Sequence, residues 1–513
     1  SKMKPQEIFL SDYKKPEFKV INIDLCFKLD PEKTIVSSEI KFKCIKNNPN
    51  IDSSLILDGK NLKLISLAID GIELNKNSYK LREDKLEILS NKITNPEFKF
   101  NCITEISPKD NTALEGLYLS EGIYCTQCEP EGFRKITYFL DRPDVMTKFK
   151  VRIEGNYKFL LSNGNLISQG QGWAEWNDPW PKPSYLFALV AGNLKVIEDE
   201  FVSMTNKKIL LQIYVEEGNE DKCEHAMNSI KKCMKWDEEI YNREYDLERF
   251  MVVAINDFNM GAMENKGLNI FNSKYVLSDK KTATDMDFEM IERIIAHEYF
   301  HNWTGNRITC RDWFQLCLKE GLTVYRDQQF SADMQNEEIV RIDDVKLLRS
   351  RQFREDAGPL RHSVRPEKYS EINNFYTATV YEKGAELIRM LNLIIGEKDY
   401  FDAIKLFFHK HDGEAITVED WIKVFEESTG RDLKQFFLWY TQSGTPIVKA
   451  KEEYSSGNFL LKLEQVVPTQ KESVKAKSMV IPIKLSFIDN NGLKIAKDEI
   501  LILNKKKQKF KFS

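Results

Sequence analysis

The chain has 513 residues, of which 42% are hydrophobic and 30% are charged, a composition typical of a soluble globular protein with roughly two to four domains. Its 75 Lys and Arg residues nearly balance its 79 Asp and Glu residues, and the basic runs are short, so we expect no nucleic-acid partner. No apolar run reaches the length of a membrane span, so we expect no membrane association.

The start of the chain and the cysteines indicate a cellular compartment. Residues 1–5 are polar and lead into no apolar segment, so we expect no signal peptide. The nine cysteines are an odd number without the spacing of a disulfide framework, which favours reduced thiols and a cytoplasmic location. Cys125 and Cys128 form a lone C-x-x-C motif, which is a weak indication of a zinc or redox site.

Residues 1–193 have the pattern of an all-β domain. Apolar and polar residues alternate with a period of two at residues 18–25 and 39–44, which predicts strands, and the apolar run 185–194 predicts a buried strand. Turn signals occur at residues 47–50, 70–71 and 162–165. We therefore expect an N-terminal β-sandwich or saddle.

Residues 194–444 change to helical periodicity after a few strands, which predicts a second domain. Within it, the small residues Gly261 and Ala262 would let a substrate backbone pair with this segment as an added edge strand. Glu264 would place a carboxylate beside the substrate, where it could bind a free α-amino group. A glycine-containing loop with a surface glutamate is an equally weighted alternative.

A helix is predicted from Thr284 or Asp285, either of which can cap its start, to Gly305, a plausible stop. It carries the motif His297-Glu298-Tyr299-Phe300-His301, in which two histidines four residues apart project from one face and can bind one metal ion. Glu298 has the position of a general base. The alternative, two incidental surface histidines, is disfavoured because the chain has only six histidines.

A second helix, predicted at residues 313–330, carries Glu320, which follows His301 after eighteen residues. No third histidine occurs before His362, so Glu320 is the natural third ligand. Two histidines and one carboxylate leave a fourth position open for water, as in catalytic rather than structural zinc sites. We therefore expect one Zn²⁺ per chain.

The remainder, residues 445–513, returns to strand patterns after the Ser443-Gly444-Thr445-Pro446 boundary. Strands are predicted at residues 459–463, 480–485 and 500–503, with a turn at residues 490–492. This pattern predicts a small C-terminal β-sandwich.

Taken together, these motifs resemble those of the aminopeptidase N family of zinc gluzincins. The residues around the motifs look like those of the bacterial alanyl aminopeptidase branch. The similarity runs from about Tyr13 to the end of the chain. The stretches that carry it, besides the histidine motif and Glu320, are residues 126–129, 131–134, 140–144, 261–265, 302–307 and 374–384.

The resemblance implies a role for each matching residue. His297, His301 and Glu320 would hold zinc, Glu298 would activate the metal-bound water, and Tyr381 would donate a hydrogen bond to the oxyanion. Glu264, Glu129 and Gln127 would bind the substrate ammonium. The other substrate-binding residues would be Gly261, Ala262 and Met263 along the peptide, and Met260 and Tyr376 at the first side-chain pocket.

The resemblance further implies a thermolysin-like catalytic domain, in an α+β chain of several domains, that removes N-terminal residues from peptides with broad specificity and is a monomer. Family members usually continue into a large helical C-terminal domain, which we expect to be absent from this chain ending at Ser513. Two alternatives stay open: a thermolysin-type endopeptidase, and a peptide-binding fragment without turnover.

Overall fold

The computed structural model describes residues 6–45, 54–471 and 474–513, which form two compact units. The N-terminal unit contains residues 14–313 and 412–416. The C-terminal unit contains the described residues up to Tyr13, then residues 314–411 and 417–513. The predicted domain boundaries after residues 193 and 444 lie elsewhere in the chain and stay predictions.

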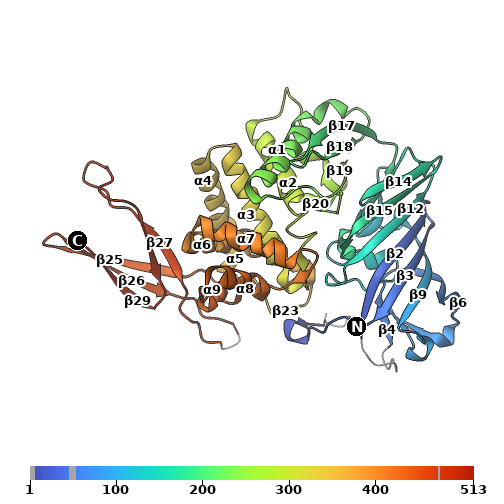
Figure 1. The fold of residues 1–513 in the computed structure, drawn as a ribbon, viewed down its shortest axis with the longest axis horizontal. Coiled ribbons are helices and arrows are strands. Elements are labelled where there is room, and N and C mark those ends of the chain that lie inside the picture. The colour runs from blue at the N-terminus through green and yellow to red at the C-terminus, as the bar shows by residue number, and fades with distance from the viewer. Residues whose placement is uncertain (1–5, 46–53, 472–473) are drawn as a thin grey trace. The chain divides into compact units, whose positions relative to one another are not determined.

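The N-terminal unit is built around an eight-stranded sheet, drawn in blue to green in Figure 1. All neighbours in it are antiparallel except β12 and β2, which run parallel. Side chains on β3 alternate between buried and partly exposed positions, with Val36, Ile40 and Phe42 fully buried. The strands predicted at residues 18–25 and 39–44 are confirmed. The order is β14 (Asn165–Gly170), β15 (Trp173–Lys182), β12 (Thr147–Glu154), β2 (Phe18–Lys28), β3 (Thr34–Cys44), β9 (Glu97–Ile106), β5 (Lys63–Ile69) and β6 (Ile72–Glu73).

Two smaller sheets complete this β region. One runs β10 (Gly116–Ser120), β11 (Ile123–Gln127), β16 (Leu189–Gly192) and β13 (Phe159–Ser162), and the other runs β4 (Leu55–Asp58), β8 (Lys85–Ile88) and β7 (Tyr79–Leu81). The predicted strand 185–194 is shorter than expected, because Ser184–Leu186 form a 3₁₀ turn after Pro183. The turn at residues 70–71 is confirmed by positive φ angles at both residues. The turn predicted at residues 47–50 lies outside the described residues.

A five-stranded mixed sheet and two helices follow in the same unit. The sheet order is β17 (Lys195–Val202), β18 (Lys208–Val215), β19 (Arg249–Ile255), β21 (Leu268–Asn272) and β20 (Ala262–Met263), which places β20 at an edge. Helices α1 (Glu224–Tyr241) and α2 (Asp285–Phe300) pack against each other and lie beside this sheet (Figure 1). The short strand β22 (Thr309–Cys310) pairs with β24 (Ala415–Ile416).

The C-terminal unit contains the remaining helices. They are α3 (Leu316–Met334), α4 (Glu337–Leu347), α5 (Phe353–Asp356), α6 (Gly384–Ile395), α7 (Glu397–His411), α8 (Val418–Thr429) and α9 (Lys434–Thr441). Two π-helical turns, η10 (Leu348–Gln352) and η12 (Thr379–Lys383), lead directly into α5 and α6. Strand β1 (Ile8–Phe9) pairs with β23 (Lys368–Tyr369), which joins the described N-terminal residues to this unit.

The chain ends in small β-sheets of the same unit. Strands β25 (Ile447–Ser455), β26 (Asn458–Val466) and β29 (Lys507–Phe512) form one sheet, and β27 (Ile481–Leu485) and β28 (Glu499–Leu503) form another. Leu461, Leu463, Leu501 and Leu503 form their shared core. The three strands predicted here are confirmed, with a positive φ at Gly492 in the predicted turn.

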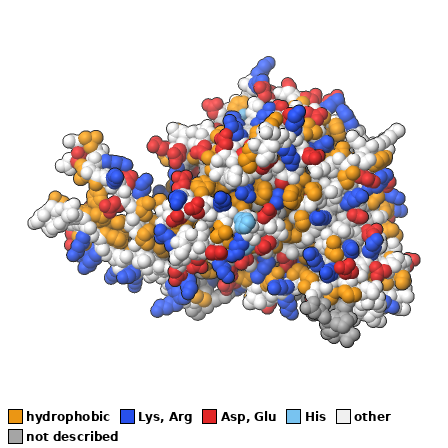
Figure 2. Space-filling view, in the orientation of Figure 1, with side chains coloured by type: hydrophobic (Ala, Val, Ile, Leu, Met, Phe, Trp, Pro, Cys, Tyr) orange, Lys and Arg blue, Asp and Glu red, His pale blue; other side chains and the backbone are white. Residues whose placement is uncertain are grey.

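The observed order of an N-terminal β region, a central mixed region with helices and a small C-terminal β region confirms the predicted fold class. Charged side chains of both signs are interspersed over the face drawn in Figure 2, as expected from the small net charge. Among the described residues, no helix is long and apolar enough to cross a membrane.

Candidate metal centre and active site

Helix α2 begins as the sequence predicts. The Thr284 hydroxyl accepts a hydrogen bond from the Asp287 backbone N–H, and the Asp287 carboxylate accepts one from the Thr284 backbone N–H. This reciprocal capping box satisfies two backbone donors at the helix start. Ile291 and Ile295 are buried and anchor the helix, so the histidine motif in its last turn is carried by a fixed element.

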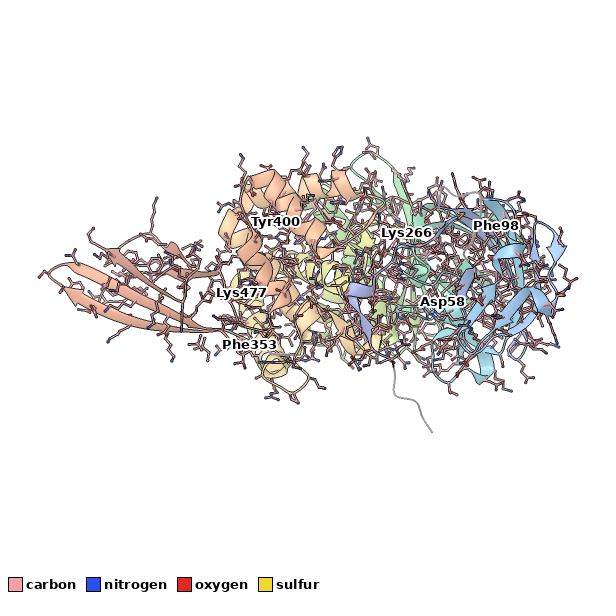
Figure 3. The ribbon with its side chains drawn as sticks, turned by 90° about the horizontal axis from the view of Figure 1, so that it is seen from below. Asp58, Phe98, Lys266, Phe353, Tyr400 and Lys477 are labelled. Atoms are coloured by element: carbon pink, nitrogen blue, oxygen red, sulfur yellow. The ribbon has the colours of Figure 1, made fainter. Side chains whose placement is uncertain are left out.

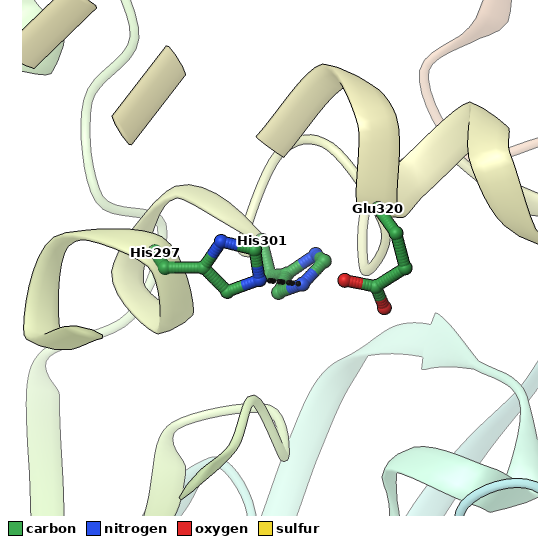
Figure 4. A group of neighbouring side chains, drawn as sticks. All are labelled: His297, His301 and Glu320. Atoms are coloured by element: carbon green, nitrogen blue, oxygen red, sulfur yellow. Dashed lines mark hydrogen bonds between the residues drawn. The ribbon is translucent and has the colours of Figure 1, made fainter. Parts of the chain in front are cut away.

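The two histidines of the motif face each other at the end of α2 (Figure 4). The Nε2 atoms of His297 and His301 are 3.1 Å apart. The Nδ1 atom of His301 lies 2.9 Å from the Thr304 carbonyl oxygen. Because a carbonyl only accepts, we assign a proton to Nδ1, which leaves Nε2 as the ring nitrogen available to a metal ion.

The helix end differs from the prediction. Helix α2 ends at Phe300, with His301 as its C-cap, and does not continue to Gly305. The hydroxyl and the backbone N–H of Thr304 both donate to the Phe300 carbonyl, which closes the last turn there. Gly305 was predicted to stop the helix, but its positive φ belongs to a turn five residues after the helix end.

Residues 302–307 form a loop directly after the histidine motif. Side-chain hydrogen bonds join this loop to the segment that carries Glu264. The Asn306 side chain donates to the Glu264 carbonyl oxygen at 2.9 Å. Lys266, labelled in Figure 3, is almost completely buried and donates to the Asn302 side chain at 2.9 Å. The loop therefore sets the positions of His301 and Glu264 relative to each other.

A buried ion pair supports this connection. Lys266 contacts the Asp246 carboxylate at 2.5 Å, and Arg307 contacts the same carboxylate at 2.9 Å. Burial alone would raise the pKa of Asp246, but the two cations hold this pKa below its usual range. Arg307 also lies between the rings of Trp180 and Trp303, at 3.8 and 4.2 Å from their centroids.

Carboxylates are concentrated around His301. Glu264, Glu298 and His301 each offer a ligand atom, and these atoms lie within 4.8 Å of one another. Glu129, at the end of the segment after β11, offers an oxygen within 4.8 Å of Glu264. Glu129, Glu264 and Glu298 are all buried. Buried carboxylates this close would repel one another, so the cluster favours cations such as a metal ion or an ammonium group.

The other predicted substrate residues of the N-terminal unit border this cluster. The Gln127 side chain donates to the Glu129 carbonyl at 3.1 Å and contacts the Met260 sulfur at 3.0 Å. Ala262 and Met263 form β20, the edge strand of the five-stranded sheet, directly after Gly261. This segment therefore lies at a sheet edge, while the pairing of a substrate with it stays a prediction.

Three predicted site residues belong to the C-terminal unit. Glu320 lies in the first turns of α3, and its carboxylate accepts a hydrogen bond from the buried Lys319 at 2.7 Å. Tyr381 lies in the π-helical turn η12, which packs against α3, and its ring is 6.4 Å from that of Tyr376.

The donor chemistry fits zinc. Two imidazole nitrogens and one carboxylate are ligands that zinc prefers, and three protein ligands are the number found in catalytic zinc sites. The fixed tautomer of His301 is a second requirement, because a ligand histidine must present an unprotonated nitrogen.

The residues that position this site were not assigned roles from the sequence. Asn306 and Lys266 act through hydrogen bonds to groups distant in sequence, whereas Thr304 acts on His301, three residues before it. The signal that could have found them is the unusual content of amides and aromatic residues in residues 302–307 immediately after the motif.

Comparisons with known families match most of the chain. Residues 14–186 match the peptidase M1 N-terminal domain, residues 225–440 match the peptidase family M1 domain, and residues 444–513 match a domain of unknown function with an Ig-like fold.

Curated relatives give the same picture. The chain is 53% identical over 461 residues to aminopeptidase N of Caulobacter vibrioides, a match covering 88% of this chain and 52% of the relative. It is 48% identical over 499 residues to aminopeptidase N of Escherichia coli, covering 95% of this chain and 56% of the relative. The chain thus spans about half the length of the curated relatives it matches.

A solved structure is also similar. The crystal structure of Legionella pneumophila aminopeptidase A in complex with aspartic acid superposes with a TM-score of 0.90 at 34% sequence identity. The match covers 99% of this chain and 58% of that chain.

Proposed function

The chain belongs to the aminopeptidase N family of M1 peptidases, and from this premise we propose that it is a zinc-dependent aminopeptidase that removes single residues from peptide N-termini. The observation that carries the proposal is the cluster around His301. There the Nε2 atoms of two histidines are 3.1 Å apart, and the carboxylates of Glu264 and Glu298 lie within 4.8 Å of His301. This cluster thereby contains residues suited to bind a metal ion, to act as a general base and to bind a substrate ammonium.

His297, His301 and Glu320 hold the zinc ion in this proposal. When bound, zinc supplies Lewis-acid polarisation of the scissile carbonyl and makes water acidic enough to attack near neutral pH. Glu298 takes the proton from the attacking water and then delivers it to the leaving amine. Tyr381 donates a hydrogen bond to the oxyanion through its phenol hydroxyl.

The carboxylates of the N-terminal unit select substrates that have a free N-terminus. Glu264 and Glu129 accept hydrogen bonds from the substrate ammonium, and the neighbouring Gln127 completes this set. The closeness of the two carboxylates supports the assignment, since an ammonium between them relieves their repulsion. An internal peptide offers no such cation, which disfavours endopeptidase action.

The edge strand β20 and its surroundings receive the substrate chain. Main-chain groups of Gly261, Ala262 and Met263 pair with the peptide, and the edge position of β20 supports this mode. Met260 and Tyr376 line the first side-chain pocket, and a flexible methionine suits a pocket that accepts small, basic and apolar side chains. We propose that the protein acts in the cytoplasm and is a monomer.

The test is hydrolysis of an alanyl chromogenic amide, compared with its N-acetylated counterpart, with and without a zinc chelator. We expect cleavage of the free amine only, abolished by the chelator and restored by zinc. Equal cleavage of both substrates would identify an endopeptidase. Retention of zinc without cleavage of either substrate would identify a peptide-binding chain without turnover.

A further inference from the structure

Tyr381 lies in an irregular part of the helix that continues into α6. Residues Thr379–Lys383 form a π-helical turn, whereas Gly384–Ile395 form an ordinary α-helix. A π-turn is equivalent to one extra residue inserted into an α-helix, and such turns are rare and frequent at functional sites. An irregular turn needs contacts from outside to persist, because its own hydrogen bonds are fewer and less favourable than those of an α-helix.

The start of this turn is held by two side chains. The Thr377 hydroxyl accepts a hydrogen bond from the Val380 backbone N–H at 3.2 Å. The Glu355 carboxylate of α5 accepts hydrogen bonds from the Thr379 backbone N–H at 2.8 Å and from the Thr379 hydroxyl at 2.6 Å. Gln352, from the preceding π-turn, also donates to the Thr379 hydroxyl at 3.2 Å. A negative charge at this position is favourable, since it lies at the start of the helix η12–α6.

A second contact secures the other end of the turn. The Lys383 ammonium donates to the Asp356 carboxylate at 2.8 Å and to the Gly444 carbonyl at 3.2 Å. Asp356 also accepts the Gly444 backbone N–H at 2.9 Å. Adjacent residues of α5, Glu355 and Asp356, therefore hold the residues on either side of Tyr381.

We propose that Glu355 is a positioning residue for Tyr381, because its carboxylate caps the first residue of the π-helical turn and so fixes the direction of the phenol. This inference rests on the proposed function, in which Tyr381 donates to the oxyanion. Such a donor acts through a preorganised position, and a displacement of about 1 Å can cost a large factor in rate. Glu355 does not touch substrate; it acts through Thr379.

The test is a double-mutant cycle in the purified zinc-loaded chain, assayed with alanyl-p-nitroanilide. Glu355→Ala is expected to lower kcat about tenfold while KM changes less than about twofold, because the lost interaction belongs to the transition state. Glu355→Gln, which keeps one acceptor oxygen for Thr379, is expected to retain more of the rate. In a Tyr381→Phe background, Glu355→Ala should lower kcat by less than about twofold, because the residue it positions no longer has a hydroxyl. Glu367→Ala, at an exposed glutamate of the same unit, is the matched control.

The outcomes separate this inference from the proposed function. Full activity of Tyr381→Phe alone would contradict the assigned role of Tyr381. A low rate in Tyr381→Phe, together with an unchanged rate in Glu355→Ala, would overturn only the role of Glu355. The same tenfold loss in both backgrounds would also overturn it, because a general structural effect does not depend on the phenol. Thermal unfolding of each variant shows that all are folded at the assay temperature.

Discussion

At the scale of single residues, His301 illustrates how hydrogen bonds outside the motif determine its chemistry. Its Nδ1 proton is held by the Thr304 carbonyl, and the loop containing Thr304 is itself held by the Asn306 and Asn302 contacts. The sequence predicted that His297 and His301 lie on one helix face, because H-E-x-x-H places them four residues apart, and their Nε2 atoms are 3.1 Å apart. It did not predict the supporting bonds, since these join residues 36 to 42 positions apart.

The assignment of Glu298 as the base leads to a first prediction. Glu298→Ala is expected to lower kcat by about 10³-fold or more, because the attacking water loses its proton acceptor. The zinc content, measured by atomic emission after gel filtration, should stay at one ion per chain. A variant that loses zinc would show that Glu298 serves as a ligand, as its closeness to His301 would also allow.

A second prediction concerns recognition of the substrate ammonium. Glu264→Gln is expected to raise KM for an alanyl amide about tenfold or more, because a charge-assisted hydrogen bond is replaced by a neutral one. The zinc content should not change. Asp257→Asn, at an exposed carboxylate shortly before the same segment, is the control. Unchanged kinetics in Glu264→Gln would remove this residue from the ammonium site.

A third prediction concerns pH. Burial raises the pKa of Glu382 to about 7 from an ordinary value of 4.5, so the folded protein holds this proton more tightly than the unfolded chain. Glu382 therefore destabilises the fold progressively as pH rises from about 4.5 to about 7, and the full cost persists above that range. Glu382→Gln should raise the free energy of unfolding at pH 8 by up to about 3 kcal/mol and leave it nearly unchanged at pH 4.5. Denaturant titrations at both pH values test this, and an equal effect at both would contradict the assignment.

At the scale of elements, the start of α2 was predicted better than its end, and the helix predicted at residues 313–330 is α3, Leu316–Met334. Thr284 caps α2 as expected, because a capping box is a local pattern. The helix ends at Phe300 because the Thr304 hydroxyl donates a hydrogen bond to the Phe300 carbonyl, so Gly305 alone did not indicate the helix end. The two π-turns could not be predicted, since the sequence of residues 379–383 is compatible with an ordinary helix and Glu355 lies 24 residues earlier.

The crossing of α3 and α6 gives a fourth prediction. A Cβ added at Gly321 would lie 2.8 Å from the Gly384 carbonyl carbon, so the two helices approach at backbone contact beside Glu320 and close to Tyr381. Gly321→Ala should lower the free energy of unfolding by about 1–3 kcal/mol, because overpacking outweighs the better helix propensity of alanine. It should also weaken zinc binding, measured by competition with a chelator.

A matched control for this substitution exists in the same unit. A Cβ at Gly358 would meet its nearest atoms at 3.4 Å, so Gly358→Ala should have little effect on either measurement. Equal stability and zinc affinity in both variants would show that α3 and α6 can separate without cost.

At the scale of the whole molecule, the order of β, mixed and β regions could be predicted because each region has its own hydrophobic period. The division into two compact units could not. Period-two alternation identifies a strand but not its partner, and the units depend on long-range pairs such as β1 with β23 and β22 with β24.

The thiols give a prediction for the whole chain. The nine cysteines, all among the described residues, form no disulfide; eight are buried and Cys26 is partly exposed. Burial raises the pKa of Cys102, Cys125 and Cys317 to about 12, so little thiolate forms in the folded state. We expect mass spectrometry after iodoacetamide treatment at pH 8 to detect slow labelling at Cys26 at most, and nine labels after denaturation. Rapid native labelling elsewhere would indicate local opening.

The π-turn at Tyr381 has a genetic consequence. Deleting the codon for Glu382 would convert the turn to a regular α-helix and rotate the preceding chain, including Tyr381, by about 100° relative to α6. The amphipathic face of α6 would remain, while Thr379 would leave Glu355 and the phenol would turn away. A single in-frame deletion could therefore convert a peptidase of this architecture into a folded, metal-binding protein without turnover.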